Sequence, residues 1–320
     1  MLCRNAFYSL LGFVVPAVLV AALPADQVTL TKSVDTVTVE IGGQPFGKLH
    51  FGRDAPKPYF APLRSASGKI VTRQYPMVEV PGETHDHQHH RGLWLGYIDV
   101  NGFNFWENEF SYHRANAGRM VARSVDVSGS GSKAARIHIL IDWLGPQDQK
   151  VLTEDRTMTF HGEPSLRIAD FDATLTAIGK AVFGDDKDGA LGVRMADKLT
   201  EKNGTGVITN SAGERGMKEV WGKRADWVDY SGTLDGEAVG IAIFDHPDSF
   251  HHPARWHARD YGLVAANPFA DHAYDPSAPV RNVTLNPGQS VHLLYRIVVH
   301  GKMDRAAIEK LYKSWAGQRK

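Results

Sequence analysis

The chain has 320 residues, and its 36 lysines and arginines are balanced by 36 aspartates and glutamates. A chain without a basic surplus lacks the charge that a phosphate backbone requires, which excludes nucleic acid as a class of partner. The hydrophobic fraction of 42% is that of a globular protein with a sizeable core. The only cysteine is Cys3, so the rest of the chain excludes disulfide frameworks, thiol nucleophiles and zinc–cysteine sites.

The N-terminus has the layout of a secretory signal peptide over residues 1–25. Arg4 gives a basic start, an almost uninterrupted apolar run extends from Ala6 to Leu23, and small residues offer cleavage sites after Ala22 and Ala25. We therefore expect an exported protein, periplasmic or secreted, and a retained membrane anchor is the alternative. No later stretch approaches about 18 apolar residues, so we expect no membrane association after the signal is removed.

Alternation of apolar and polar residues predicts strands along most of the remaining chain. The segments with this period are 37–41, 137–143, 166–175, 239–243 and 291–299. The apolar residues of 166–175 change parity part-way, and a single strand there would need a bulge near Ala169 or Asp170. Residues 184–190 and 202–236 are polar and rich in glycine, so we expect long loops, which often carry function.

Helical periodicity is clear only at the end of the chain. Ile308, Leu311, Tyr312 and Trp315 have the spacing of one helix face, which predicts a helix over 304–316 with Asp304 as its N-cap. Many strands, one helix and no βαβ rhythm indicate an all-β protein. We expect a large antiparallel β-sandwich over residues 26–300, with residues 301–320 forming a helix packed on the same domain.

The strongest local signal is the segment 84–94, which contains His85, His87, His89 and His90. One interpretation is a catalytic cleft, because a histidine is a ready acid or base near neutral pH. A second is a divalent-metal site formed by His85, His87 and His89, since neutral imidazoles are good ligands. The third is a structural loop whose histidines hydrogen-bond the backbone.

Aromatic residues follow this segment and surround a tight turn at Asn101-Gly102. Trp94 and Trp106, together with the amide of Asn101, are the residue types that a sugar site uses, because an aromatic face stacks on C–H groups while polar groups bind hydroxyls. Packing in the core is the alternative, which we favour for Phe103 and Phe105.

A second polar cluster lies between residues 245 and 267, directly after an apolar strand. Loops at the rim of a sheet often carry sites. We expect functional side chains at this rim, with Arg194 projecting from another strand into the same cleft; solvated loop charge is the alternative. The candidates in this cluster are Asp245, His246, Arg255, His257, Asp260 and Tyr261.

Several of these motifs resemble a known family. The segments 89–94, 99–102, 105–106, 227–232, 243–247 and 255–262 together resemble the bacterial PmoA-like family. The label of that family, methane oxygenase, implies a membrane assembly that a chain without a later transmembrane segment does not form. The resemblance implies instead an exported β protein, with an architecture similar to the sugar mutarotases.

Together these features predict a carbohydrate-active protein, which we interpret as an enzyme performing epimerisation, elimination or hydration on a sugar or modified sugar. Such chemistry needs an acid, a base and a cation to hold an oxyanion or carboxylate. Two alternatives stay open: a metal-dependent oxygenase or hydrolase, and a non-catalytic sugar-binding module. We expect a sugar or glycoside as partner and no cofactor, with a divalent metal as the alternative; the sequence does not predict the oligomeric state. The expected catalytic residues are His89, His90, Asp245, His246 and His257, and the expected substrate-binding residues are Arg91, Trp94, Asn101, Trp106, Arg194, Arg255, Asp260 and Tyr261.

Overall fold

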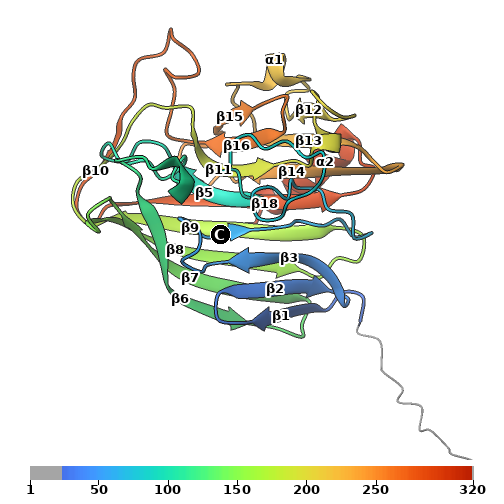
Figure 1. The fold of residues 1–320 in the computed structure, drawn as a ribbon. Coiled ribbons are helices and arrows are strands. Elements are labelled where there is room, and N and C mark those ends of the chain that lie inside the picture. The colour runs from blue at the N-terminus through green and yellow to red at the C-terminus, as the bar shows by residue number, and fades with distance from the viewer. Residues whose placement is uncertain (1–23, 319–320) are drawn as a thin grey trace, which may run out of the picture.

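The computed structural model describes residues 24–318, and the predicted signal peptide lies outside these residues except for its last two positions. Two eight-stranded antiparallel sheets pack against each other, and a C-terminal helix lies on one of them (Figure 1). The predicted fold class, a large antiparallel β-sandwich with a C-terminal helix, is therefore confirmed. Within residues 24–318 none of the helices has the length and apolar character needed to cross a membrane.

The first sheet carries the polar motifs of the sequence, and the second supplies most of the long strands. In spatial order the first sheet contains β1 (Val28–Lys32), β2 (Thr36–Ile41), β3 (Gln44–His50), β4 (Tyr59–Phe60), β5 (Leu93–Tyr97), β11 (Gly189–Arg194), β16 (Leu263–Asn267) and β15 (Arg255–Ala258). The second contains β12 (Val207–Asn210), β13 (Trp227–Leu234), β14 (Glu237–Asp245), β18 (Ser290–His300), β9 (Arg167–Ala177), β8 (Lys150–His161), β7 (Ala134–Leu144) and β6 (Arg119–Ser128). A separate ribbon pairs β10 (Ala181–Phe183) with β17 (Val283–Leu285).

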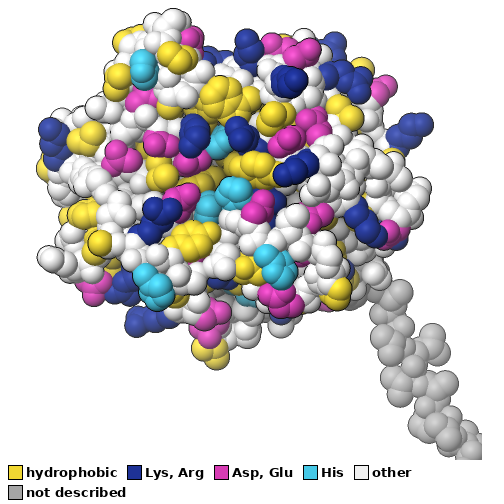
Figure 2. Space-filling model, turned by 45° about the horizontal axis from the view of Figure 1, so that its top comes forward, with side chains coloured by type: hydrophobic (Ala, Val, Ile, Leu, Met, Phe, Trp, Pro, Cys, Tyr) yellow, Lys and Arg dark blue, Asp and Glu magenta, His cyan; other side chains and the backbone are white. Residues whose placement is uncertain are grey.

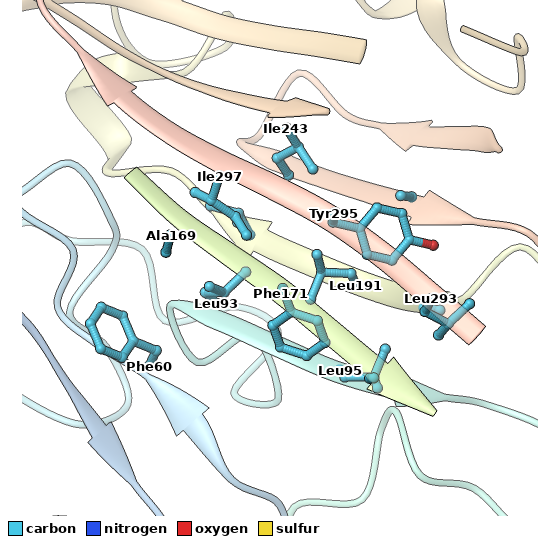
Figure 3. Packing of buried hydrophobic residues seen from close by; sticks show 14 of the residues in the cluster. Phe60, Leu93, Leu95, Ala169, Phe171, Leu191, Ile243, Leu293, Tyr295 and Ile297 are labelled. Carbon is cyan, nitrogen blue, oxygen red and sulfur yellow. The ribbon is translucent and has the colours of Figure 1, made fainter. Parts of the chain in front are cut away.

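The core fills the space between the two sheets. In Figure 3, Leu93, Leu95 and Leu191 of the first sheet lie close to Phe171 and Leu293 of the second, and all five are at most 2% exposed. Because successive side chains of a strand point to opposite faces, the residues between them on β5 and β11 lie on the outer face of the first sheet. That outer face is where the candidate site is found.

The C-terminal helix α2 (Arg305–Ala316) begins as predicted, since the Asp304 side chain accepts a hydrogen bond of 2.8 Å from the backbone N–H of Ala307. Ile308, Tyr312 and Trp315 are buried against the outer face of the second sheet. Ile168 of β9 belongs to this outer-face cluster, which explains the apolar parity of Leu166 and Ile168. The predicted bulge near Ala169 or Asp170 is therefore wrong: β9 keeps a continuous register with both neighbours, with Ile168 under α2 and Phe171, Ala173 and Leu175 in the core between the sheets.

The expectation of one long loop over residues 202–236 is also wrong. This segment contains β12, all of β13 and a single-turn helix α1 (Met217–Val220). Except for Gly232 in β13, its glycines lie between these short elements. Two 3₁₀ turns complete the secondary structure: η1 (Phe110–Tyr112) and η2 (Asp197–Leu199).

Candidate active site

The floor of the candidate site is the outer face of the first sheet. The register aligns four residues across four strands, in the order Trp94, Gly192, Ala265 and His257. Because Gly192 and Ala265 have small side chains, the surface is depressed at the centre of this row. A Cβ atom at Gly192 would lie only 2.8 Å from ring carbons of Trp94 and Trp106, so glycine is what lets both indoles pack there.

Two fully buried arginines fix the histidine-rich loop above this floor. Arg194, on β11, donates a 2.7 Å hydrogen bond to the Asp86 carboxylate. Arg73 bonds the same carboxylate, and it also donates to the backbone carbonyls of Asp86 and His87, each at 2.8 Å. Because two guanidinium groups share one carboxylate, the loop carries an excess positive charge at its base.

The Asp86 carboxylate is held ionised by these contacts. Burial opposes its charge, but the interaction with His87 and the charges of Arg194 and Arg73 prevail and lower the pKa of Asp86 well below its usual range. The His87 Nδ1 lies 3.1 Å from the carboxylate, and His87 adopts a left-handed backbone conformation with φ of 42°. The carboxylate thus sets the loop conformation that brings the next two histidines over the floor.

The imidazoles of this loop pack into one aromatic cluster. His90 is stacked between His87, at 4.9 Å, and Trp94, at 5.0 Å. The ring of His89 lies 4.3 Å from that of His90, and its Nδ1 is 3.1 Å from the hydroxyl of Tyr112. Trp94 and its neighbouring indole therefore support the histidines from below.

Each of the two buried histidines keeps one ring nitrogen free. His89 is 3% exposed and His90 is 1% exposed, yet no side chain or backbone group within residues 24–318 pairs with the Nε2 of either ring. Arg194 donates to Nδ1 of His90 at 3.3 Å, which places the ring proton of a neutral His90 on Nε2. Neither Nε2 is among the buried unpaired atoms of the described residues, so both nitrogens reach the solvent of the hollow and are accessible to a ligand.

Both histidines are held neutral. Burial is the main cause that places the pKa of His89 and His90 well below 6.5, and nearby positive charge adds to it, from Lys57 at His89 and from Arg194 at His90. Lys57 is itself buried, and its ammonium donates to the Trp106 carbonyl at 2.7 Å; burial lowers the pKa of Lys57 to about 7.

On the other side of the floor, His257 forms a dyad with Asp188. The His257 Nδ1 lies 3.1 Å from the Lys187 carbonyl and 3.3 Å from Oδ1 of Asp188. Donation from Nδ1 to that carbonyl leaves Nε2 as the basic nitrogen. Burial opposes the charge of Asp188, but the hydrogen bond and charge of His257 outweigh it and lower the pKa of Asp188 to about 2.

The two halves belong to one site. The Tyr261 ring is stacked on His87 at 4.9 Å and lies under the Arg194 guanidinium at 4.7 Å. Burial lowers the pKa of His89 and raises the pKa of Tyr261, and Asp188 is close enough that its charge favours the protonated form of both groups. Figure 2 shows histidines near the centre of one face, set in a hollow among hydrophobic, basic and acidic side chains.

The structure thus brings together five of the predicted residues, and it does not bring Asp245 and His246 to them. Asp245 is fully buried at the end of β14, where its carboxylate accepts from the backbone N–H of Ala254 at 2.8 Å and pairs with His252. His246 packs edge-on against Trp315 of helix α2 at 4.8 Å. Both belong to the second sheet and its helix, so the predicted meeting of all the ionisable residues in one cleft is wrong for these two. The five that do meet are His89, His90, Arg194, His257 and Tyr261.

The other predicted binding residues lie around the site or away from it. Trp94 and Trp106 are each 1% exposed, which makes them supports for the histidines and leaves no open face for a sugar. Arg91 forms a two-pronged pair with Glu109 at the edge of the site, with distances of 2.8 and 2.7 Å. Arg255 is bound to Asp271 at 2.7 Å.

Two further predicted residues have structural contacts. Asn101 bridges the turn to β10 by a 2.9 Å bond to the Lys180 carbonyl and a 2.8 Å bond from the Val182 N–H. The backbone carbonyl of Asp260 accepts from the Tyr230 hydroxyl at 3.0 Å, next to Tyr261. Only the second of these positions adjoins the candidate site.

Sequence reasoning missed the residues that organise the site. Arg73, Asp86, Tyr112 and Asp188 were not among the expected site residues. Asp86 stood inside the histidine motif, and Asp188 stands in the acidic segment 185–188 just before a buried strand, so both had a usable signal. Arg73 had none, because its partners lie in a loop whose path the sequence does not show.

The alternative metal site is not assembled by the described residues. Within residues 24–318 no group of three histidine, cysteine, aspartate or glutamate side chains is arranged to hold a metal ion. His85 stacks on Tyr75 at 4.3 Å and pairs with Glu79 at 3.1 Å, away from His87 and His89. The three histidines that alternate in sequence therefore do not converge.

No curated protein matches this sequence. The model of DUF6807, a family of unknown function, matches residues 36–313. The chain belongs to the DUF6807 family. The resemblance to a PmoA-like family is thereby corrected, because the motifs that carried it, from residues 89–94 to 255–262, all lie inside the matched region.

Solved structures with a similar arrangement cover most of this DUF6807 chain. The GH36 alpha-galactosidase AgaB from Geobacillus stearothermophilus is 11% identical, with a TM-score of 0.46 over 86% of this chain and 41% of its own. A galactose mutarotase related enzyme from Lactobacillus acidophilus is 11% identical, with a TM-score of 0.37 over 87% and 99% of the two chains. The chain thus spans about two fifths of the galactosidase. Identities and TM-scores this low say nothing of substrate or reaction.

Acidification is expected to destabilise the protein through the two neutral histidines. Because their folded-state pKa lies below 6.5, the unfolded chain binds more protons as the pH falls through that value, and the free energy of unfolding decreases. The free energy of unfolding has its full value above pH 6.5, and below that pH it falls by up to about 1.4 kcal/mol per pH unit for each histidine. Urea unfolding at pH 7, 6 and 5 measures this slope.

The slope should be smaller in a double variant, His89→Asn with His90→Asn, than in the original protein. His138→Asn is the matched control, because His138 is 40% exposed on β7 and pairs only with Asp155. Equal slopes in the original protein and the double variant would contradict the assignment of neutral His89 and His90.

Proposed function

We propose that this DUF6807 protein is a carbohydrate-active enzyme that moves protons on a sugar or modified sugar bound over β5, β11, β16 and β15. One observation carries the proposal: two adjacent, almost completely buried histidines keep their Nε2 atoms unpaired, opposite a histidine supported by a carboxylate. These nitrogens are the part of the two rings that reaches solvent, so a bound ligand can contact them while the rest of each ring is held by the protein.

In this proposal His257 is the base. Its Nδ1 faces the Lys187 carbonyl and Asp188, so the free Nε2 takes a proton from a C–H bond next to a carbonyl while the Asp188 carboxylate stabilises the imidazolium that forms. The electron pair of the C–H bond moves onto the carbonyl oxygen. Protonation of the opposite face of the carbon by water, with release of the His257 proton to solvent, gives epimerisation. Transfer of the His257 proton to a neighbouring hydroxyl, which leaves as water, gives elimination.

His90 is the electrophilic partner in this proposal. Its Nδ1 accepts from Arg194, so its Nε2 carries a proton and donates to the oxygen on which charge develops. A neutral imidazole is a suitable donor here, because burial and Arg194 disfavour the charged form. Arg73 and Arg194 both bond the Asp86 carboxylate, and in this proposal their guanidinium charges favour the same oxyanion.

A sugar suits the walls of this site. Tyr112 and Tyr261 offer ring edges and hydroxyls, while Lys187 and Arg259 supply cationic donors at the rim, and hydroxyl-rich rings are recognised by such a mixture of aromatic and polar groups. The export predicted from residues 1–25 belongs to the same proposal, which places the enzyme in the periplasm or outside the cell. We propose that the reaction needs no metal.

Exchange of solvent deuterium into the substrate tests the proposal. The protein is incubated in D₂O with aldoses, keto-sugars and uronic acids, and loss of C–H signals is followed by proton NMR. We expect deuterium to enter one carbon of at least one sugar, with or without EDTA. Restoration of activity only by an added metal would favour the metal-dependent alternative.

Binding without exchange would favour the sugar-binding module instead. Isothermal titration calorimetry with the same panel separates these cases, because a module gives heat of binding and leaves every C–H signal intact. Absence of both binding and exchange across the panel would contradict a carbohydrate function.

A further inference from the structure

A second hollow lies on the same outer face, over β3 and β4. Its volume is about 470 Å³, within the range of ligand pockets. The floor comes from β3 and β4, and the segment 74–78 and Arg91 form the wall. The side chains around it include Lys48, His50, Asp54, Tyr59, Gln74 and Met77.

This hollow adjoins the candidate active site. Tyr59 on β4 is paired in register with Trp94 on β5, and Trp94 supports His90 with a ring separation of 5.0 Å. Arg91 follows His90 in the chain, and its guanidinium lies 5.2 Å from the centre of the Tyr59 ring. One ligand long enough to pass Arg91 would therefore reach both places.

Several polar groups around the hollow are available to a ligand. Within the described part of the chain no protein group pairs with the Lys48 ammonium, the Asp54 carboxylate, the Gln74 side-chain amide or Nδ1 of His50. In contrast, Arg91 is paired with Glu109 by two hydrogen bonds. Donors and acceptors of both signs are thus available around one cavity, as binding of several hydroxyl groups requires.

The aromatic part of the hollow is rigid. His50 is stacked on Tyr59 with ring centres 4.6 Å apart and planes 5° from parallel. Its Nε2 lies 3.2 Å from the Ala61 carbonyl, which orients the ring and leaves Nδ1 as an acceptor. Met77 and Pro76 add an apolar wall. A sugar ring, with C–H faces and hydroxyl edges, matches this combination better than a wholly apolar group.

We propose that this hollow binds a second sugar ring, so that the substrate is a disaccharide or a longer glycan that places one ring beside His89 and His90 and the next beside Lys48, His50 and Asp54. The inference rests on the proposed carbohydrate function and adds the size of the substrate to it.

The test uses the double variant Lys48→Ala with Asp54→Ala, which keeps the net charge and removes two groups without protein partners. Calorimetry compares glucose, galactose and glucuronic acid with cellobiose, lactose, maltose and trehalose. We expect at least one disaccharide to bind the original protein more tightly than its constituent monosaccharides. In the variant its Kd should rise at least tenfold, as loss of hydrogen bonds to charged groups predicts, while monosaccharide binding stays unchanged.

A matched control removes an exposed lysine and aspartate elsewhere, Lys202→Ala with Asp126→Ala, and should change neither affinity. Met77→Trp, which fills the hollow, should weaken disaccharide binding alone. Monosaccharide binding with no gain from a second ring, or equal losses for both ligand sizes in the variants, would overturn the second subsite and leave the proposed function standing. Tighter binding of 4-nitrophenyl glycosides than of any disaccharide would also overturn it, whereas failure of all sugars to bind would remove the proposed function itself.

Discussion

Glu154→Ala is expected to destabilise the protein by about 3–5 kcal/mol, a large share of the free energy of unfolding of a typical domain. Glu154 is completely buried on the inner face of β8, where it bonds Nε of Arg156 at 2.6 Å and Nε1 of Trp143 at 2.8 Å. The alanine variant would leave the Arg156 guanidinium charged between the two sheets, 4.8 Å from the Phe171 ring, without its counter-ion. Urea unfolding monitored by tryptophan fluorescence measures the loss.

The neighbouring residue of the same strand offers a matched control. Asp155 is 61% exposed on the outer face and pairs with His138 at 2.7 Å, so Asp155→Ala should cost less than about 1 kcal/mol. Removing both buried charges, in Glu154→Leu with Arg156→Met, should cost less than Glu154→Ala alone, because no unpaired ion remains. A Glu154→Ala variant as stable as Asp155→Ala would contradict this account.

The sequence predicted the sandwich because apolar and polar residues alternate along its strands, which is the pattern of sheets that each bury one face. Ile137, Ile139 and Ile141 share one face of β7, and all three are fully buried between the sheets. Alternation failed where both faces are covered. Ile168 lies on the outer face of β9 because α2 packs over it, and a pattern within a single strand does not reveal a helix that follows more than 120 residues later.

The same limitation explains the mixed outcome at the site. Asp245-His246 and the segment around His257 look alike in sequence, since both are ionisable residues at apolar strands. The first lies where the second sheet meets α2 and the 249–254 turn, so its side chains are enclosed by the protein. The second lies on the uncovered outer face of the first sheet. Whether a sheet face is exposed to solvent depends on the packing of the whole chain, so a short sequence motif does not predict it.

His257→Asn is expected to lower the rate of deuterium exchange by 10²- to 10⁴-fold, the usual contribution of a general base, with little change in ligand binding. The reason is geometric: Nε2 of His257 is the basic nitrogen in the proposed mechanism, since Nδ1 faces the Lys187 carbonyl at 3.1 Å and the Asp188 carboxylate at 3.3 Å. His85→Asn is the control, because His85 is 54% exposed and pairs only with Glu79.

Asp188→Asn separates a positioning role from a structural one. Asp188 does not take the proton in the proposed mechanism; its carboxylate orients His257 and favours the imidazolium. The variant should lose rate by a smaller factor than His257→Asn, and the acidic limb of its pH–rate profile should move to lower pH, a shift that a merely loosened loop would not produce. An unchanged profile together with exchange by His257→Asn at the original rate would remove His257 and Asp188 from the mechanism and leave His89 as the base.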